Sequence, residues 1–126
     1  MKPISTFFTI VFMDDLVERN AIYYKQFSDV PYTGKVTGLK QGSFKDGQRE
    51  GYWSNYYENG QLKLKGKYKN GVAEGEWVYY YDNGQLSSKG DYKNDKFNGA
   101  WVVYNFNGTV DKALTGTFKD GKKIRD

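Results

Sequence analysis

The stretch GEWVYYYDNGQL, residues 75–86, decides the fold, because variants of it lie 24 residues upstream and 24 residues downstream. GYWSNYYENGQL occupies residues 51–62, and GAWVVYNFNGTV occupies residues 99–110. The three copies place the only tryptophans of the chain at Trp53, Trp77 and Trp101. A fixed period of this length is typical of repeat proteins, in which each copy is one supersecondary unit that packs on its neighbours.

Two turn signals separate the alternating runs within each repeat. Asn-Gly and Asp-Gly dipeptides favour two-residue hairpin loops, because both central residues of such a loop need a positive φ. The first signal is Asn59-Gly60, Asn83-Gly84 and Asn107-Gly108, and the second is Asp46-Gly47, Asn70-Gly71, Asn94-Asp95 and Asp120-Gly121. The sequence therefore predicts an all-β fold, namely an extended, twisted, antiparallel single-layer meander of β-hairpins with two strands per repeat.

The predicted turns fix which residues lie opposite one another. A two-residue loop at Asn59-Gly60 places Tyr57 opposite Leu62 and Trp53 opposite Gly66. Large rings that lie across a bare glycine stabilise strands that contain glycine. We therefore expect the tryptophans and their glycine partners to be the structural residues of the sheet, and these partners are Gly66, Gly90 and Gly116.

Two details of the register follow from the same counting. The loop at Asn70-Gly71 sets Lys67 opposite Glu74 and Lys65 opposite Glu76. The last repeat carries two extra residues, which we interpret as a bulge near Lys112–Leu114 that keeps Trp101 opposite Gly116. An even insertion preserves the two-residue alternation of a strand, so we expect Val110, Leu114, Gly116 and Phe118 to share one face.

The chain divides into an apolar N-terminal segment, residues 1–14, and one repeat domain, residues 15–126. Ile4–Met13 follows one basic residue but lacks a small-residue cleavage site, so it is either a signal-like remnant or a first strand. Residues 15–27 predict a hairpin around Asn20-Ala21. We expect repeats at about 34–50, 51–74, 75–98 and 99–121, with Val36 in place of tryptophan in the first and a polar tail after the last.

Composition excludes several classes of chemistry. The 126 residues include no Cys and no His, which removes thiol nucleophiles, Ser-His-Asp triads and His-based zinc sites. The recurring carboxylates, Glu50 with Glu74 and Glu58 with Asp82, lie beside turns and are lost in the last repeat. We therefore expect a protein that is not an enzyme and that holds no cofactor and no metal ion.

The motif Gly-x-Trp-x-x-Tyr-Tyr-x-Asn-Gly-Gln-Leu, followed by Lys-Gly-x-Tyr-Lys-Asn-Gly, resembles the MORN repeat, and more closely its bacterial variant form. The resemblance covers about residues 34–121, and Asn105, Asp95 and the two-residue insertion depart from it. It implies extended sheets that act as binding scaffolds for proteins and sometimes for membranes or lipids. It also implies an antitoxin-like or immunity-like role, and many bacterial variants are exported.

Two faces of the predicted sheet are candidates for binding. The Trp, Leu and Tyr face is expected to form the core, with a partly exposed groove as the alternative. The opposite face carries our candidate binding residues, Tyr56, Tyr80 and Tyr104 together with Lys45, Lys69, Lys93 and Lys119, although a charge ladder is usually a solvated surface.

The expected partner is another protein, with a toxin among the options, and the alternative is an anionic lipid surface in the membrane or envelope. Nucleic acid is disfavoured, because carboxylates interrupt the positive field and no recognised nucleic-acid motif appears in the sequence. Export or a cell-envelope location is favoured slightly over the cytoplasm.

Overall fold

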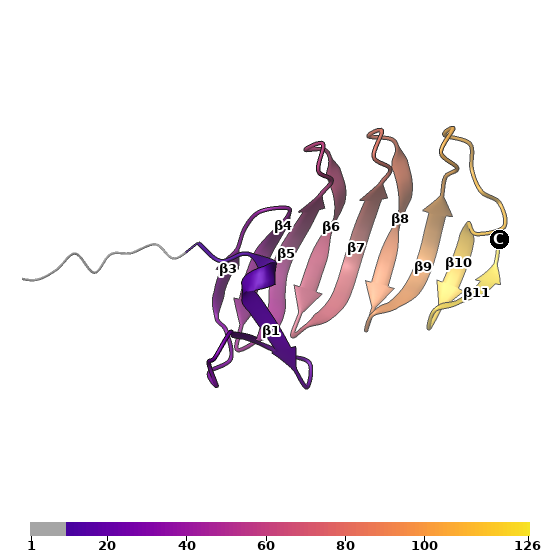
Figure 1. Ribbon diagram of the computed structural model, residues 1–126. Coiled ribbons are helices and arrows are strands. Elements are labelled where there is room, and N and C mark those ends of the chain that lie inside the picture. The colour runs from indigo at the N-terminus through magenta and orange to yellow at the C-terminus, as the bar shows by residue number, and fades with distance from the viewer. Residues whose placement is uncertain (1–9) are drawn as a thin grey trace, which may run out of the picture.

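A computed structural model describes residues 10–126, so most of the apolar segment before Met13 lies outside the described residues. Nine strands form one antiparallel sheet in which every strand pairs with its neighbours in sequence, from β3 at one end to β11 at the other (Figure 1). A separate two-stranded hairpin lies at the N-terminal end of this sheet. The all-β meander of hairpins is thereby confirmed.

The bounds of the elements follow the repeat closely. They are the 3₁₀ turn η1 (Met13–Asp15) and the strands β1 (Leu16–Arg19), β2 (Ile22–Lys25), β3 (Gly34–Val36), β4 (Lys40–Lys45), β5 (Gln48–Tyr56), β6 (Leu62–Lys69), β7 (Val72–Tyr80), β8 (Leu86–Lys93), β9 (Lys96–Val103), β10 (Gly116–Lys119) and β11 (Lys122–Arg125). No helix within residues 10–126 has the length and apolar character needed to cross a bilayer.

The second turn of each repeat is the two-residue loop that the sequence predicts. Asn70 and Gly71 have φ values of 52° and 80°, and Lys69 pairs with Val72 across them. Asn94 and Asp95 adopt the same conformation at 52° and 66°, so aspartate replaces glycine in the third of these four turns without changing its type.

The first turn of each repeat differs from the prediction. Gly60 has a φ of 89° but Asn59 does not share it, and the Gly60 N–H donates to the Tyr57 carbonyl at 2.9 Å. Tyr57 N–H donates in turn to the Gln61 carbonyl at 2.9 Å, which defines a three-residue loop closed by a glycine bulge. Tyr56, rather than Tyr57, therefore pairs with Leu62, and Tyr80 rather than Tyr81 pairs with Leu86.

A compensating shift restores the predicted register further along these strands. Between Asn55 and Tyr56 the pairing slips by one residue, so Asn55 again lies opposite Leu64 and Trp53 opposite Gly66. The prediction placed the tryptophans correctly because the loop and this second irregularity cancel. Trp77 opposite Gly90 and Trp101 opposite Gly116 are confirmed in the same way.

The indole rings lie across the glycines of the preceding strand. A Cβ on Gly66 would overlap Cδ2 and Cε2 of Trp77, and a Cβ on Gly42 or Gly90 would overlap Trp53 or Trp101. Each indole thus lies between two glycines and covers the N-terminal one. The expectation that each ring covers the glycine it pairs with is therefore wrong, because Gly66 lies under Trp77 and Gly90 lies under Trp101. The side chain nearest to Gly116 is Lys123.

Glycines with positive φ bend the strands that carry the tryptophans. Lys67 pairs with Glu74, but Lys65 pairs with Val78, so β7 contains two more residues than β6 over this interval. Gly75, with a φ of 72°, lies at the start of the excess. The predicted pairing of Lys65 with Glu76 is therefore wrong, although the even excess leaves Trp77 on its expected face.

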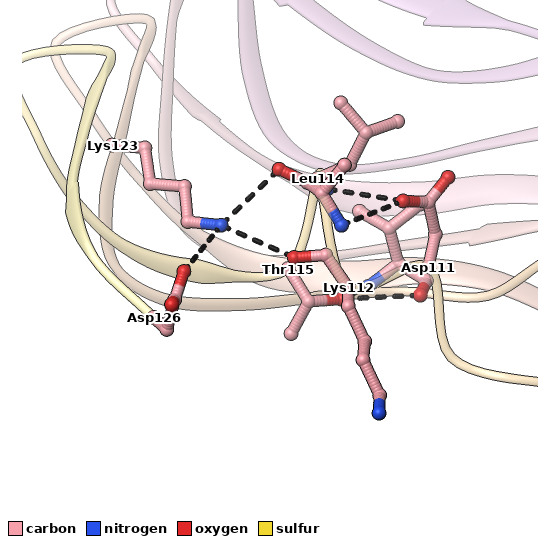
Figure 2. Close-up of polar contacts among 8 residues, drawn as sticks. Asp111, Lys112, Leu114, Thr115, Lys123 and Asp126 are labelled. Carbon is pink, nitrogen blue, oxygen red and sulfur yellow. Dashed lines mark hydrogen bonds and ion pairs between the residues drawn. The ribbon is translucent and has the colours of Figure 1, made fainter.

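The C-terminal end closes the sheet with a strand instead of a polar tail. Lys122–Arg125 forms β11, which pairs with β10. Lys112–Leu114 lies in a turn, which is a larger excursion than the predicted bulge, and Leu114 is removed from the strand face and 56% exposed. The Lys123 ammonium group lies 2.9 Å from Asp126 and donates to two carbonyls of this turn, those of Lys112 and Ala113 (Figure 2).

Aromatic rings form the core of the single sheet. Trp53, Trp77 and Trp101 are only 2–3% exposed. At the N-terminal end they are joined by Val11, Leu16, Val36 and Phe44, so the small hairpin and the residues before it cover that end of the face. Val36 pairs with Gly42 as Trp53 pairs with Gly66, which confirms it as the tryptophan equivalent of the first repeat.

We expect Gly66→Ala to lower the free energy of unfolding by roughly 1–3 kcal/mol, because the added methyl group displaces the Trp77 indole. Urea unfolding monitored by tryptophan fluorescence measures this loss. Gly75→Ala is the control, since nothing lies within 4 Å of its Cβ and only backbone strain of about 1 kcal/mol is added. Equal losses in the two variants would contradict ring packing over Gly66.

Candidate functional site

The two predicted binding rows lie at opposite ends of the strands. Tyr56 and Tyr80 end β5 and β7 and are half-buried, and Tyr104 forms a bridge with Val110 just after β9. The lysines Lys45, Lys69, Lys93 and Lys119 are exposed and precede the two-residue turns at the other end. Seven residues separate Tyr56's partner Leu62 from Lys69, or roughly 23 Å of strand, so the rows do not form one site.

The lysine row is denser than the sequence analysis indicated. Lys93 pairs directly with Lys96, and Lys119 pairs with Lys122, and all four side chains are exposed. Directly opposed like charges destabilise a strand pair. The residues that flank a two-residue turn always face each other, so this pairing was readable from the sequence once the turns were placed.

Tyr57 and Tyr81 connect consecutive repeats, a role that the sequence analysis missed. The Tyr57 hydroxyl donates to the Tyr80 carbonyl at 2.6 Å, and the Tyr81 hydroxyl donates to the Tyr104 carbonyl at 2.7 Å. The last repeat has Asn105 at this position. The sequence does contain a sign of this contact: the second tyrosine of the Tyr-Tyr doublet is present where another repeat follows and is absent from the last repeat.

The repeating carboxylates Glu50 and Glu74 serve the turns of the following strands. The Asn70 N–H donates to Glu50 Oε1 at 3.0 Å, and the Asn94 N–H donates to Glu74 Oε1 at 3.3 Å. These bonds satisfy backbone groups at the two-residue turns. Glu50 and Glu74 therefore have a structural function in this sheet, which accounts for their recurrence without any catalytic role.

The face opposite the tryptophans is hollowed in two successive places. One hollow of about 530 Å³ lies over β5, β6 and β7, and its lining includes Tyr52, Lys65, Lys67, Glu76 and Val78. A second hollow of about 640 Å³ lies over β8, β9 and β10, and its lining shares Glu76 with the first. We call this surface the hollowed face.

Charges of both signs and one prominent ring lie on the hollowed face. Tyr52 is 79% exposed, with the Lys67 ammonium 5.9 Å from the centre of its ring. Lys89 and Glu76 form an ion pair of 3.9 Å between the two hollows. Val78 is buried at 7% exposure and forms an apolar floor. Aromatic and apolar groups within a mixed-charge surround are typical of protein interfaces.

Hydrogen-bonded tyrosines cover the aromatic core near its centre. The hydroxyls of Tyr79 and Tyr92 lie 2.9 Å apart, and the Tyr79 ring stacks on Trp77 at a centroid distance of 6.5 Å. Burial, followed by the hydrogen bond to Tyr92, raises the pKa of Tyr79 well above its usual value of 10.0. Burial likewise raises the pKa of Tyr68. These phenols serve as neutral packing groups.

Within the part of the chain that the structure describes, no cluster of three or more acidic side chains is positioned to hold a metal ion. The sheet instead offers repeated hairpins, an aromatic face whose indoles are buried, and a hollowed face. These features define a β-hairpin repeat protein.

Comparison with protein families finds a match to two segments of the chain. Residues 49–70 and residues 73–94 each match the family described as MORN repeat variant, so these two segments are similar to MORN repeats of this form. Each match spans one strand pair, β5 with β6 and β7 with β8. MORN repeats are in general non-catalytic modules found in binding and membrane-associated proteins. No curated protein gives a significant match to the chain.

We expect alkaline pH to destabilise the sheet through Tyr79. A raised folded-state pKa means that its contribution is complete below the unfolded value of 10.0 and is lost as the pH rises above it. Between about pH 8 and about pH 11, Tyr79→Phe should lose less unfolding free energy than the wild type, by on the order of 0.5–1 kcal/mol. Urea denaturation at both pH values measures this difference. Tyr52→Phe, which changes an exposed phenol, should behave like the wild type.

Proposed function

We propose that this protein is a non-catalytic scaffold that binds another protein through the hollowed face. The proposal rests on the difference between the two faces of the sheet: one is buried as the core and the other is exposed. The tryptophan face is used for the core, with its indoles 2–3% exposed, whereas the opposite face keeps two hollows and an exposed Tyr52. A large aromatic ring that stays 79% exposed on a rigid sheet is well suited to anchor a partner.

The dimensions of the sheet agree with such an interface. The nine strands contain between six and seven residues on average, which is roughly 22 Å, and side by side they extend over roughly 38 Å. Their product, about 800 Å², matches the roughly 800 Å² that each partner contributes to a standard protein interface. The two hollows lie within this area, so one partner is able to occupy both.

The finer form of the proposal is that the scaffold neutralises its partner, as an antitoxin or immunity protein does. A surface of this size with charges of both signs supports tight and selective binding of one protein, because complementary charges set both orientation and specificity. A sheet that is held rigid by its own core also loses little conformational entropy on binding.

A pull-down from the lysate of the source organism tests the binding role. We expect the wild type to retain a stoichiometric partner, and Tyr52→Ala to weaken that retention at least tenfold, because exposed aromatic anchors contribute most to interfaces. Phe27→Ala is the matched control, since Phe27 is fully exposed in the turn that follows the separate hairpin. The Tyr56→Ala, Tyr80→Ala, Tyr104→Ala triple variant tests the tyrosine row independently.

Failure to capture a partner, or equal capture by wild type and Tyr52→Ala, would remove the proposed interface. The neutralising role requires a further result beyond binding. Co-expression of the scaffold must restore growth to cells that the captured partner poisons, and the Tyr52→Ala variant must restore it less.

A second candidate is supported by the lysine pairs at the turn edge. Lys93 with Lys96 and Lys119 with Lys122 are directly opposed, which costs stability unless an anionic surface offsets the repulsion. We propose, as the alternative function, that this edge binds anionic lipid headgroups together with Lys45 and Lys69. Each lysine near such a membrane contributes about 1 kcal/mol.

Co-sedimentation with vesicles tests the alternative. We expect binding to vesicles rich in phosphatidylserine, no binding to vesicles of phosphatidylcholine alone, and loss of binding as salt rises. Lys93→Gln with Lys119→Gln should weaken binding at least tenfold, since two favourable charges are removed. Lys63→Gln with Lys65→Gln removes the same charge away from the turn edge and should have little effect. Binding that ignores both salt and the turn-edge lysines would count against this function.

A further inference from the structure

At its N-terminal end the tryptophan face contains three polar side chains that depart from its aromatic pattern. Cross-strand pairing aligns one row of residues beside the tryptophans, and this row is Lys40, Asn55, Leu64, Tyr79, Ser88 and Val103. A second row lies on the other side of the tryptophans and contains Phe44 and Arg49, then Tyr68 and Ala73, then Tyr92 and Phe97. Lys40, Asn55 and Arg49 occupy these rows at the N-terminal end of the face.

Comparison of the repeats shows what these substitutions change. Tyr79 occupies the position of Asn55 one repeat later, and its ring lies 6.5 Å from both Trp77 and Trp101 and covers the space between them. Asn55 is too short to do the same between Trp53 and Trp77. A hollow of about 140 Å³ remains there, and its lining includes Lys40, Arg49, Asn55 and Leu64 between the two indoles.

Arg49 brings a half-buried cation to this hollow without a carboxylate partner. Its guanidinium carbon lies 5.0–5.8 Å from the ring centres of Tyr23, Phe44, Trp53 and Tyr68. Its one hydrogen bond to a side chain, among the described residues, is a long contact of 3.4 Å to the Tyr23 hydroxyl. No carboxylate of residues 10–126 lies within 4.0 Å of it. A partly desolvated charge of this kind is stabilised by a counter-charge.

We infer that the hollow is a binding site for a carboxylate group on a short aliphatic stem. The planar guanidinium fork of Arg49 matches a carboxylate, the Lys40 ammonium adds a second positive charge, and the Asn55 amide adds further donors. Leu64, Tyr79 and Trp77 supply an apolar wall for the stem. Inorganic phosphate also matches a guanidinium fork, but it has no aliphatic stem to contact the apolar wall, so the lining favours the carboxylate.

The site is open beside Lys40, whose side chain is exposed. Lys40 also lines two neighbouring hollows, one of about 260 Å³ with Tyr56 and one of about 430 Å³ with Phe12 and Leu39. Phe12 and Leu39 are 48% and 50% exposed. A carboxylate that belongs to a larger ligand therefore enters past Lys40 with apolar surface beside it. The carboxylate is either that of a free organic acid or that of an acidic side chain on a bound protein.

Titration with N-acetylglutamate, followed by the indole N–H signals in NMR, tests the inference on the full chain. We expect saturable shifts of the Trp53 and Trp77 signals in the millimolar range and an unmoved Trp101 signal, which serves as an internal control. Arg49→Ala, which installs the residue of the next repeat, should weaken binding at least tenfold. Asn55→Tyr, which installs the ring of the next repeat, should also abolish it while the protein stays folded.

The matched control is Lys112→Ala, which removes one exposed positive charge from the C-terminal turn and should leave the titration unchanged. Absent or unsaturable shifts, equal shifts of all three indoles, an undiminished response in Arg49→Ala, or tighter binding of inorganic phosphate would each overturn the inference. Both substituted residues occur naturally at the equivalent positions, Ala73 and Tyr79, and a retained urea midpoint confirms that each variant is folded.

A captured partner distinguishes the two sources of the carboxylate. Weaker retention by Arg49→Ala than by the wild type assigns the carboxylate to an acidic side chain of that partner, and equal retention with an intact titration assigns it to a free organic acid. The titration requires no partner protein. A negative titration therefore contradicts the carboxylate site alone, whereas a negative pull-down contradicts the proposed scaffold function alone.

Discussion

The contact between an indole ring and bare glycine backbone is the interaction on which the rest of the structure depends. Each of Gly42, Gly66 and Gly90 leaves room for the ring of Trp53, Trp77 or Trp101, and a methyl group at any of them would overlap that ring. The close approach buries the large ring against backbone whose polar groups are already paired in the sheet. A single layer thereby gains a core that would otherwise need a second layer of structure.

The other rings extend this contact into a continuous aromatic spine. Edge-to-face neighbours run from Phe44 through Trp53, Tyr68, Trp77 and Tyr92 to Trp101, with centroid distances of 5.0–6.2 Å. Phe97 then stacks on Trp101 at 3.9 Å, and Lys123 lies against Gly116 where a further indole would be expected. The spine is sealed by the small hairpin at one end and by the Lys123 network at the other, so its ends do not expose bare rings.

The sequence predicted the pairing of the tryptophans but not the local devices that achieve it. Asn59-Gly60 and Asn70-Gly71 are the same dipeptide, yet the Asn59 side chain accepts the Gln61 N–H at 2.9 Å in a three-residue loop, whereas Asn70 adopts a positive φ. A dipeptide alone does not distinguish these turns. The bulge at Gly75 was equally hidden, because a glycine before a tryptophan does not show whether its φ is positive. Lys122–Arg125 was missed because β11 depends on Lys123 reaching carbonyls that only the folded turn presents.

The candidate sites differ in how far the repeat pattern reveals them. Rows that recur in every copy, such as Tyr56 with its equivalents, are explained first by a role in stabilising the sheet. Glu50 and Glu74 are an example, because these recurring carboxylates accept hydrogen bonds from backbone N–H groups of the turns. Breaks in the pattern carry more information about binding. Asn55 in place of tyrosine opens a space in an otherwise filled core, and Arg49 places a cation there at an energetic cost that packing alone does not require. In a repeat protein, the copy that departs from the packing solution of its neighbours is therefore the first place to look for a ligand.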